Sequence, residues 1–291
     1  MFTKAAVLGA GSWGTALSIA LADRGLDVTL YGNEAHVRDE INASHRNSTY
    51  LPDIELPKRI RCTLDPGEIV DKPILLLVVP SQVARLVLSH IARIGLPPTT
   101  LIVNCTKGID PSTGVLMHEL VAEFFPENPI AVLSGPSHAE EVAQRMATLA
   151  TVGAVESSVA AKVQELFALP WFRTYTSHDV IGIELGGVVK NVFAIAAGAI
   201  DGLGLGDNAK AAMVTRALAE MTRLGVALGA KEETFRGLSG LGDLIVTCYS
   251  VHSRNNRMGQ MLGSGMTLEE ASAKMSQVAE GVPNARNAHA L

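Results

Sequence analysis

A glycine-rich turn near the start of the chain has the residue types and spacing of a phosphate-binding loop. It follows an apolar run, opens an apolar helical pattern and reads Gly9-Ala10-Gly11-Ser12-Trp13-Gly14. In such a strand–turn–helix unit, Gly9 permits the tight turn, Gly11 lets the backbone approach a pyrophosphate, and Gly14 allows close packing of helix on strand. The unpaired N–H groups and the positive dipole end of the helix would bind the phosphates. We therefore expect a dinucleotide site here; the alternative is an ordinary turn between strand and helix.

Lys190 is an amine in unusual surroundings within a helical pattern. When residues 186–201 are wound at about 100° per residue, one face gathers apolar side chains and is the expected core face: Val188, Val189, Val192, Phe193, Ile195, Ala196, Ala199 and Ile200. Around Lys190 the opposite face carries mainly small residues: Gly187, Asn191, Ala194, Ala197, Gly198 and Asp201. A lysine that snorkels from a surface helix usually has other long charged neighbours, and close helix packing would leave a lysine little room. The pattern favours a functional amine beside a hollow.

A hydroxyl, amides and guanidinium groups stand together at the expected start of another helix, in the run Ser253-Arg254-Asn255-Asn256-Arg257. Arginine presents a planar fork of donors and a helix start adds backbone N–H groups, so this run suits a phosphate. The alternative is an N-cap serine followed by solvated arginines. Asp243 ends the glycine-rich loop 237–243, which could be only a flexible linker whose acid caps the segment 244–248.

Small or polar residues follow the three expected strands at 74–79, 101–104 and 130–133. Because ligands bind at the carboxyl ends of the strands in an open α/β sheet, these loops mark the edge where a dinucleotide would lie. Lys107, beside Gly108, is the one fixed cation among them. A solvated surface lysine is the alternative, but the position favours contact with a ligand.

The loop after the second strand should report on the choice of cofactor. An acid there would hold the ribose hydroxyls of NAD, whereas an arginine would suit the 2′-phosphate of NADP. Glu34 lies about 20 residues after Gly14, as expected for such an acid, but the amide of Asn33 could hydrogen-bond either cofactor. The sequence leaves the preference between NAD and NADP open.

These residues would be positioned by an α/β fold in which a Rossmann-like doubly wound sheet precedes an all-helical domain. Strands are predicted at 5–8, 28–31, 60–63, 74–79, 101–104, 130–133, 149–152 and 172–175, with helices between them such as 82–94, 113–124 and 159–169. Several strands are continuous apolar runs, as in parallel sheets buried on both faces. We place a dinucleotide-binding domain at 1–178 and a helical domain at 179–291. The helical domain includes expected helices at 209–229 and 266–275, and Lys210 would lie on a solvated or interface face of the former.

Composition limits the class of protein. The chain has 291 residues, 47% of them hydrophobic and 18% charged, so we expect about two globular domains without disorder. The net charge of −5 argues against nucleic acid as the main partner. Cys62, Cys105 and Cys248 are far apart and indicate buried thiols in a reducing compartment, with no disulfide frame or metal site. No signal peptide or membrane span is expected, and the predicted location is the cytoplasm.

Seven motifs together resemble the NAD(P)-dependent glycerol-3-phosphate dehydrogenases of the bacterial soluble type. They run through nearly the whole chain, in the order of that family, and they lie at residues 9–17, 106–108, 134–136, 186–191, 240–244, 253–255 and 278–281. The resemblance implies interconversion of sn-glycerol 3-phosphate and dihydroxyacetone phosphate with NAD or NADP, supplying glycerophospholipid synthesis. It also implies a homodimer.

The resemblance further implies roles for individual residues. Lys190 would be the catalytic proton acceptor. Glycerol phosphate would be bound by Lys107, Gly135, Ser137, Asp243, Ser253, Arg254 and Asn255. The cofactor would be bound, besides the glycines of the N-terminal turn, by Ser12, Trp13, Asn33, Tyr50, Lys107, Ala139, Arg254, Val278 and Glu280.

Three departures from the family pattern matter. Asn33 stands where many relatives carry arginine or histidine, which removes the usual cation for a 2′-phosphate. His138 follows Ser137 where an aromatic residue is common. Relatives usually continue some tens of residues beyond Leu291, so we expect the final helices of the second domain to be missing. Two other functions stay open: a hydroxy-acid or sugar-acid dehydrogenase of the same architecture, and a dinucleotide-sensing protein without catalysis.

Overall fold

The computed structural model describes residues 2–275 and 277–290, and the chain divides into two units. Unit 1 comprises Met1–Thr106, Met117–Leu133 and Ser137–Val180, and unit 2 comprises Lys107–Leu116, Ser134–Pro136 and Ile181–Leu291. The short segments at 107–116 and 134–136, which follow two strands of the sheet, therefore belong to unit 2, although the sequence-based division at 178/179 left them in the first domain.

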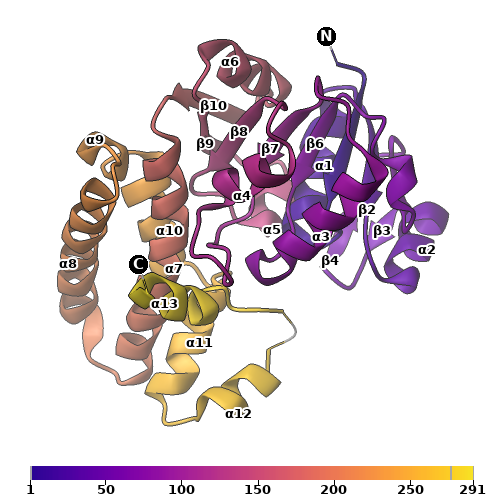
Figure 1. The fold of residues 1–291 in the computed structure, drawn as a ribbon. Coiled ribbons are helices and arrows are strands. Elements are labelled where there is room, and N and C mark those ends of the chain that lie inside the picture. Colours follow the sequence, from indigo (N-terminus) through magenta and orange to yellow (C-terminus); the bar gives the residue numbers. More distant parts are fainter. Residues whose placement is uncertain (1, 276, 291) are drawn as a thin grey trace. The chain divides into compact units, whose positions relative to one another are not determined.

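Unit 1 is built on a parallel sheet with the strand order β10-β9-β8-β7-β6-β1-β2-β5 (Figure 1). All eight expected strands are confirmed: β1 (Lys4–Leu8), β2 (Asp27–Tyr31), β5 (Ile60–Thr63), β6 (Ile74–Leu77), β7 (Leu101–Asn104), β8 (Ile130–Ser134), β9 (Thr148–Gly153) and β10 (Phe172–Ser177). β1 pairs in parallel with both β2 and β6, and β6 pairs in parallel with β7. Every residue of β6 and β7 is buried, which explains their unbroken apolar runs.

Helices alternate with the strands of unit 1: α1 (Ser12–Asp23), α2 (Ala35–Ser44), α3 (Ser81–Ile94), α4 (Met117–Phe124), α5 (Ala139–Ala143), α6 (Ser157–Leu166) and the 3-10 turn η1 (Pro66–Glu68). The prediction of a helix from residue 113 is wrong at its start. The Ser112 and Thr113 hydroxyls donate to the Asp110 carboxylate, and this local turn competes with helix before Met117.

A small antiparallel hairpin, β3 (Arg46–Asn47) and β4 (Leu51–Glu55), lies between α2 and β5 and was not predicted. Its buried Asn47 donates from Nδ2 to the carbonyl of Ala10 at 3.0 Å and to the Thr15 hydroxyl at 2.8 Å. The hairpin therefore stabilises the glycine-rich turn between β1 and α1 through these hydrogen bonds.

Unit 2 is helical: α7 (Val180–Gly202), α8 (Gly206–Ala227), α9 (Glu232–Phe235), the π-helical turn η2 (Leu238–Gly242), α10 (Asp243–Tyr249), α11 (Arg254–Gly263), α12 (Leu268–Ala273) and α13 (Gly281–Ala290). Its main core packs α7, α8, α9 and α10 around residues such as Val188, Met221, Phe235 and Leu244. Two details differ from prediction. The loop 237–243 is the turn η2 with the start of α10, and a capping box at Thr267 and Glu270 starts α12 at Leu268.

The expected core face of α7 is wrong in the second half of the helix. Ala196 is exposed there, whereas Ala194, Ala197 and Gly198 on the opposite face are buried. The reason is close helix packing: a Cβ on Gly198 would lie 1.9 Å from the carbonyl oxygen of Asn256 in α11. The small residues serve this contact and do not simply leave a hollow.

The helical pattern of α8 predicted that Lys210 lies on a solvated or interface face, and this prediction is wrong. Lys210 is buried, its ammonium donates to Asp201 at 2.7 Å, and it lies 4.6 Å from the ring centroid of Tyr249. The salt bridge and the aromatic face compensate the burial of its charge.

By length and composition α7 could cross a membrane, but 72% of its most apolar window is buried inside the protein. A core helix of a soluble protein passes the same test, so this is weak evidence for a span. The expectation of no membrane span stays a prediction.

Candidate active site

The glycine-rich turn of unit 1 connects β1 to α1, and its glycines differ in what surrounds them. Gly9 has φ +120°, and a Cβ there would lie 2.5 Å from the Val78 carbonyl oxygen. A Cβ on Gly14 would lie 1.8 Å from the carbonyl oxygen of Gly9, whereas a Cβ on Gly11 would meet nothing within 4 Å. Gly9 and Gly14 are therefore required by the fold, and the space at Gly11 is open to a ligand.

The start of α1 also offers hydrogen-bond donors. Gly11 is its N-cap residue and makes no side-chain cap hydrogen bond, and the backbone N–H groups at the start of a helix suit an anion. Nε1 of Trp13 is buried and has no acceptor among the described residues. Ser12 is buried in the same turn. These observations fit a pyrophosphate-binding turn.

Exchanging these glycines for alanine should separate ligand binding from folding. Gly11→Ala is expected to leave the melting temperature nearly unchanged but to weaken NADH binding at least about tenfold, because its methyl group would occupy the space a pyrophosphate needs. Gly14→Ala should instead lower stability by about 1–3 kcal/mol through overpacking. Thermal unfolding and NADH titration of both variants test this; normal NADH affinity in Gly11→Ala would place the pyrophosphate elsewhere.

The remaining cofactor candidates of unit 1 lie on two other elements. Asn33 is exposed in the turn after β2. Tyr50, carried by the turn of the β3–β4 hairpin, donates its hydroxyl to the Glu34 carboxylate at 2.6 Å. Ala139 is the first residue of α5, and Ser137 lies two residues before it in the chain. Tyr50 is thus brought beside the turn after β2, which sequence patterns alone had given no reason to expect.

In unit 2, one carboxylate holds two lysines. Asp243, at the start of α10, is buried and accepts from Lys190 of α7 through Oδ1 and from Lys107 through Oδ2, the latter at 2.8 Å. Lys107 also donates to the carbonyl of Gly135 at 3.2 Å, and Lys190 donates to the Thr247 hydroxyl at 2.9 Å. Four residues from distant parts of the sequence, Lys107, Gly135, Lys190 and Asp243, are thereby gathered in one cluster.

The alternatives of a surface Lys190 and a capping Asp243 are both wrong. Lys190 is 5% exposed and Asp243 is 1% exposed. The Asp243 side chain makes no cap, since Gly242 is the N-cap of α10 and the carboxylate faces the two lysines. A buried acid and a buried amine in contact are more typical of a functional site than of a solvated loop.

Burial and neighbouring charges shift the protonation of this cluster. Burial lowers the pKa of Lys190 to about 7; the charge of Asp243 opposes this shift and that of Lys107 adds to it. Burial would raise the pKa of Asp243, but the charges and hydrogen bonds of Lys107 and Lys190 together hold it below its usual range. The cluster therefore places an amine that can change protonation near neutral pH beside a carboxylate whose ionised form the two lysines favour.

The expected phosphate-binding run lies at the start of α11. Ser253 is the N-cap, and its hydroxyl accepts from the Asn256 N–H at 3.1 Å, so the capping role proposed as the alternative is present. Asn255 is buried; its Nδ2 donates to Oδ1 of Asn191 at 2.8 Å, and its Oδ1 accepts from the Gly281 N–H at 2.8 Å. Arg254 is half-buried and donates from Nη1 to Gln277 at 3.1 Å. The run holds α7, α11 and α13 together while presenting one guanidinium at a helix start.

Two further candidates lie just before and at the start of α13. Val278 is 52% exposed, whereas Glu280 is half-buried. The geometry gives Val278 no chemical role of its own.

Sequence reasoning missed Thr247 and Asn191, which contact the candidate residues directly. Thr247 follows Asp243 by four residues on α10, so its hydroxyl lies on the same face, where it donates to the Asp243 carbonyl at 2.5 Å and accepts from Lys190. Asn191 follows Lys190 and joins α7 to Asn255. The i, i+4 spacing from Asp243 to Thr247 was a signal that could have identified the threonine.

Two family models match the chain. The model described as the N-terminus of NAD-dependent glycerol-3-phosphate dehydrogenase matches residues 4–160, and the model of its C-terminus matches residues 179–291. The chain belongs to the NAD-dependent glycerol-3-phosphate dehydrogenase family. The resemblance seen in the seven sequence motifs is therefore confirmed over both parts of the chain.

Individual members of the glycerol-3-phosphate dehydrogenase family are similar over nearly the full chain. Glycerol-3-phosphate dehydrogenase [NAD(P)+] of Bacillus thuringiensis (strain Al Hakam) is 51% identical over 293 residues, covering 99% of this chain and 86% of the relative. The solved glycerol-3-phosphate dehydrogenase of Coxiella burnetii is 40% identical with a TM-score of 0.96, covering 99% and 89% of the two chains. The enzyme from Saccharomyces cerevisiae is 27% identical with a TM-score of 0.84, covering 99% and 90%.

Proposed function

We propose that this chain interconverts sn-glycerol 3-phosphate and dihydroxyacetone phosphate with NAD(H) or NADP(H), and that the reaction supplies glycerophospholipid synthesis. The observation that carries the proposal is the buried Lys190 amine held on the Asp243 carboxylate. The open space at Gly11 and the donor-rich start of α1 support binding of the dinucleotide. When bound, the nicotinamide would accept or supply the hydride.

Lys190 would move the proton that accompanies this redox change. In the oxidising direction, its neutral amine accepts the proton of the secondary hydroxyl of glycerol 3-phosphate. In the reducing direction, its ammonium polarises the ketone of dihydroxyacetone phosphate and returns the proton. Asp243 and Thr247 hold the lysine nitrogen from two sides, so its direction is fixed before substrate arrives. Lys107, on the other oxygen of Asp243, adds a positive charge for the substrate anion.

The rate should depend on pH through Lys190, whose pKa burial lowers to about 7. Oxidation of glycerol 3-phosphate needs the neutral amine, so its kcat should rise as the pH increases through about 7 and then level off. Reduction needs the ammonium, so its kcat should fall over the same range. Steady-state rates in both directions from pH 5.5 to 9.5 test the assignment. Two profiles that rise and fall together would assign the proton transfer to another group.

Arg254 would hold the phosphate away from the reacting carbon, with Ser253 and Asn255 at the same helix start. Arg254→Ala should raise the KM for dihydroxyacetone phosphate at least about tenfold, since an arginine–phosphate contact contributes about 1.5–3 kcal/mol. At saturating NADH, its rate with unphosphorylated dihydroxyacetone should change much less. Arg257→Ala is a matched control, because Arg257 is an exposed arginine one turn further along α11. An unchanged preference for the phosphorylated substrate in Arg254→Ala would place the phosphate elsewhere.

The direct test of the proposed function is oxidation of NADH and of NADPH by the purified chain with dihydroxyacetone phosphate, followed by absorbance. Hydroxy acids, sugar acids and dihydroxyacetone are the comparison substrates. Turnover only with the phosphorylated ketone supports the proposal, turnover with a hydroxy-acid pair supports the other dehydrogenase, and cofactor binding without any turnover supports a sensor. We also propose that the protein forms a homodimer and works in the cytoplasm.

A further inference from the structure

The turn after β2 carries an acid whose direction is fixed by the neighbouring hairpin. Glu34 occupies the N-cap position of α2, yet its side chain makes no cap hydrogen bond. One carboxylate oxygen instead accepts the Tyr50 hydroxyl at 2.6 Å. A carboxylate has about four lone-pair sites, so most of its acceptor capacity is still available for a ligand.

The Tyr50 hydroxyl keeps this contact over the whole working range of pH. Burial, followed by the hydrogen bond and the charge of Glu34, raises the pKa of Tyr50 to about 12. The phenol therefore stays protonated and donates to Glu34, which orients the carboxylate as a persistent acceptor at this position.

The basic side chains Arg38 and His36, which follow β2, already have partners. Arg38, in the first turns of α2, forms an ion pair with Asp39 at 2.7 Å. The His36 ring lies within hydrogen-bond distance of the Thr49 hydroxyl, at 3.3 Å. Asn33, the exposed residue just before Glu34, brings an uncharged amide to the turn. The turn thus presents the Glu34 carboxylate, and the guanidinium of Arg38 is paired with a different acid.

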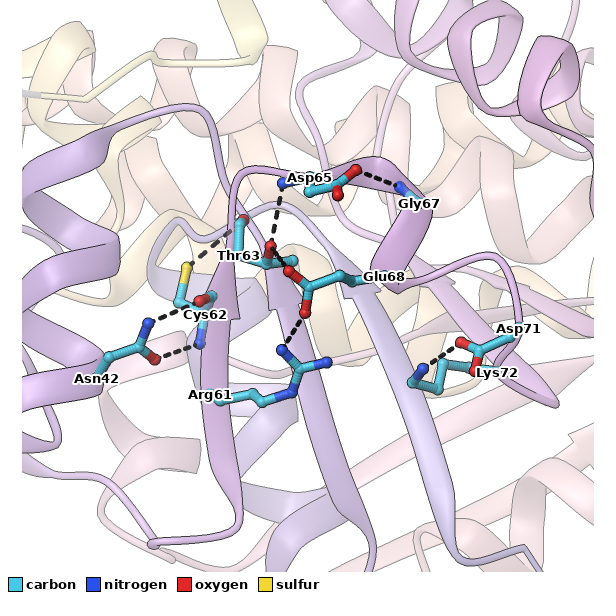
Figure 2. A network of polar contacts seen from close by, with 9 residues as sticks. All are labelled: Asn42, Arg61, Cys62, Thr63, Asp65, Gly67, Glu68, Asp71 and Lys72. Atoms are coloured by element: carbon cyan, nitrogen blue, oxygen red, sulfur yellow. Dashed lines mark hydrogen bonds and ion pairs between the residues drawn. The ribbon is translucent and has the colours of Figure 1, made fainter.

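The strand beside β2 adds further acids at the same edge of the sheet. β5 pairs in parallel with β2, and the Gly32 N–H donates to the Thr63 carbonyl at 3.1 Å, so the two strands end together. After β5, the Thr63 hydroxyl donates to Glu68 at 2.9 Å, and Glu68 also holds Arg61, while Asp65 caps the following turn (Figure 2). Glu68 is paired with Arg61, so of these two acids Asp65 is the one whose charge makes a 2′-phosphate less favourable at this edge.

We propose that Glu34, oriented by Tyr50, makes the dinucleotide site selective for NAD(H) over NADP(H). The carboxyl end of the second strand is where a Rossmann unit meets the adenosine ribose, so Glu34 would accept hydrogen bonds from the ribose hydroxyls. A 2′-phosphate would replace one of these donors, the 2′-hydroxyl, with negative charge that faces the carboxylate directly. The inference rests on the proposed function only in requiring a dinucleotide at the glycine-rich turn.

Binding of the two reduced cofactors, measured without substrate, tests the inference. The unmodified chain should bind NADH at least about tenfold more tightly than NADPH, because like charges in contact are strongly unfavourable. Glu34→Gln keeps the size of the side chain and removes its charge, so it should lose most of that preference, mainly through tighter NADPH binding. Tyr50→Phe should show a partial loss in the same direction, since it leaves the carboxylate charged but no longer oriented.

Two control variants separate the proposed role of Glu34 from the effects of changing any other charge on α2. Glu40→Gln removes another acid of α2, one that accepts from the Ser48 N–H at 2.9 Å and supports the same hairpin, so it should leave the preference unchanged. Arg38→Ala should not weaken NADPH binding. Equal or tighter binding of NADPH by the unmodified chain, an unchanged preference in Glu34→Gln, or a tenfold loss of NADPH affinity in Arg38→Ala would each overturn the inference. If NADH binds selectively but dihydroxyacetone phosphate is not reduced, the proposed function fails while this inference stands.

Discussion

Replacing Lys190 by alanine is expected to lower kcat by about 10²–10⁴-fold, the contribution of a positioned acid–base group. Lys190 is the amine that burial brings to a pKa of about 7, and it contacts both Asp243 and Thr247. Since its proposed role is proton transfer, NADH affinity should be unaffected. Reduction of dihydroxyacetone phosphate and NADH titration measure the two quantities. Added methylamine should restore part of the rate, because a small amine can enter the space that the lysine side chain leaves.

Lys210→Ala is the matched control for Lys190→Ala. Lys210 is also buried in unit 2, but the acid that it pairs with in the described part of the chain is Asp201. Both variants remove a buried amine, so a loss of stability common to both can be separated from a loss of catalysis. Turnover near normal in Lys190→Ala, or an equal loss in Lys210→Ala, would remove the special role of Lys190.

The sheet of unit 1 could be predicted from the sequence because its strands are short apolar runs bounded by turn residues. Ile74–Leu77 shows why: a strand buried on both faces must be apolar at every position, and no surface helix produces that pattern. The glycine-rich turn was predictable for a related reason, since Gly9 and Gly14 occupy places where backbone atoms leave no room for a Cβ.

The same reasoning failed where packing between distant segments decides the outcome. Periodicity assigned the apolar face of α7 to the core, but the backbone of α11 packs on the face that carries Gly198. Small side chains permit either a hollow or a close approach, and the sequence does not distinguish the two. Tyr50 likewise reaches Glu34 only because of a two-stranded hairpin too short to leave a strand pattern.

The sequence predicted some residues of the candidate site, but it predicted almost none of the contacts between them. Lys190 was selected by its small neighbours, although those neighbours turned out to serve helix packing as well. That Lys107 and Lys190 share one acid depends on contacts between residues 136 and 53 positions apart in the sequence. Such a pairing depends on the tertiary fold, and no local sequence pattern predicts it.

The shared acid makes Asp243→Asn the most informative variant for stability. The carboxylate is 1% exposed and is the shared hydrogen-bond acceptor of two lysines, of which Lys190 is itself buried. An asparagine has nearly the same shape but no charge, and its Nδ2 would point a donor at one lysine. Removing one partner of a buried charge cluster costs about 3–5 kcal/mol, so the free energy of unfolding of unit 2 should fall by about that amount, and turnover should fall with it.

Urea unfolding followed by far-ultraviolet circular dichroism measures this loss. Tryptophan fluorescence would not, because both tryptophans, Trp13 and Trp171, belong to unit 1. Asp201→Asn is the matched control: Asp201 pairs with a single buried lysine and its side chain is 30% exposed, so its loss should be clearly smaller. If Asp243→Asn were as stable as the unmodified chain, at least one of the lysines would have to be neutral in the folded protein. The charge of Asp243 would then not be needed to hold Lys190 and Lys107, and the assignment of Asp243 as the residue that orients Lys190 would lose its physical basis.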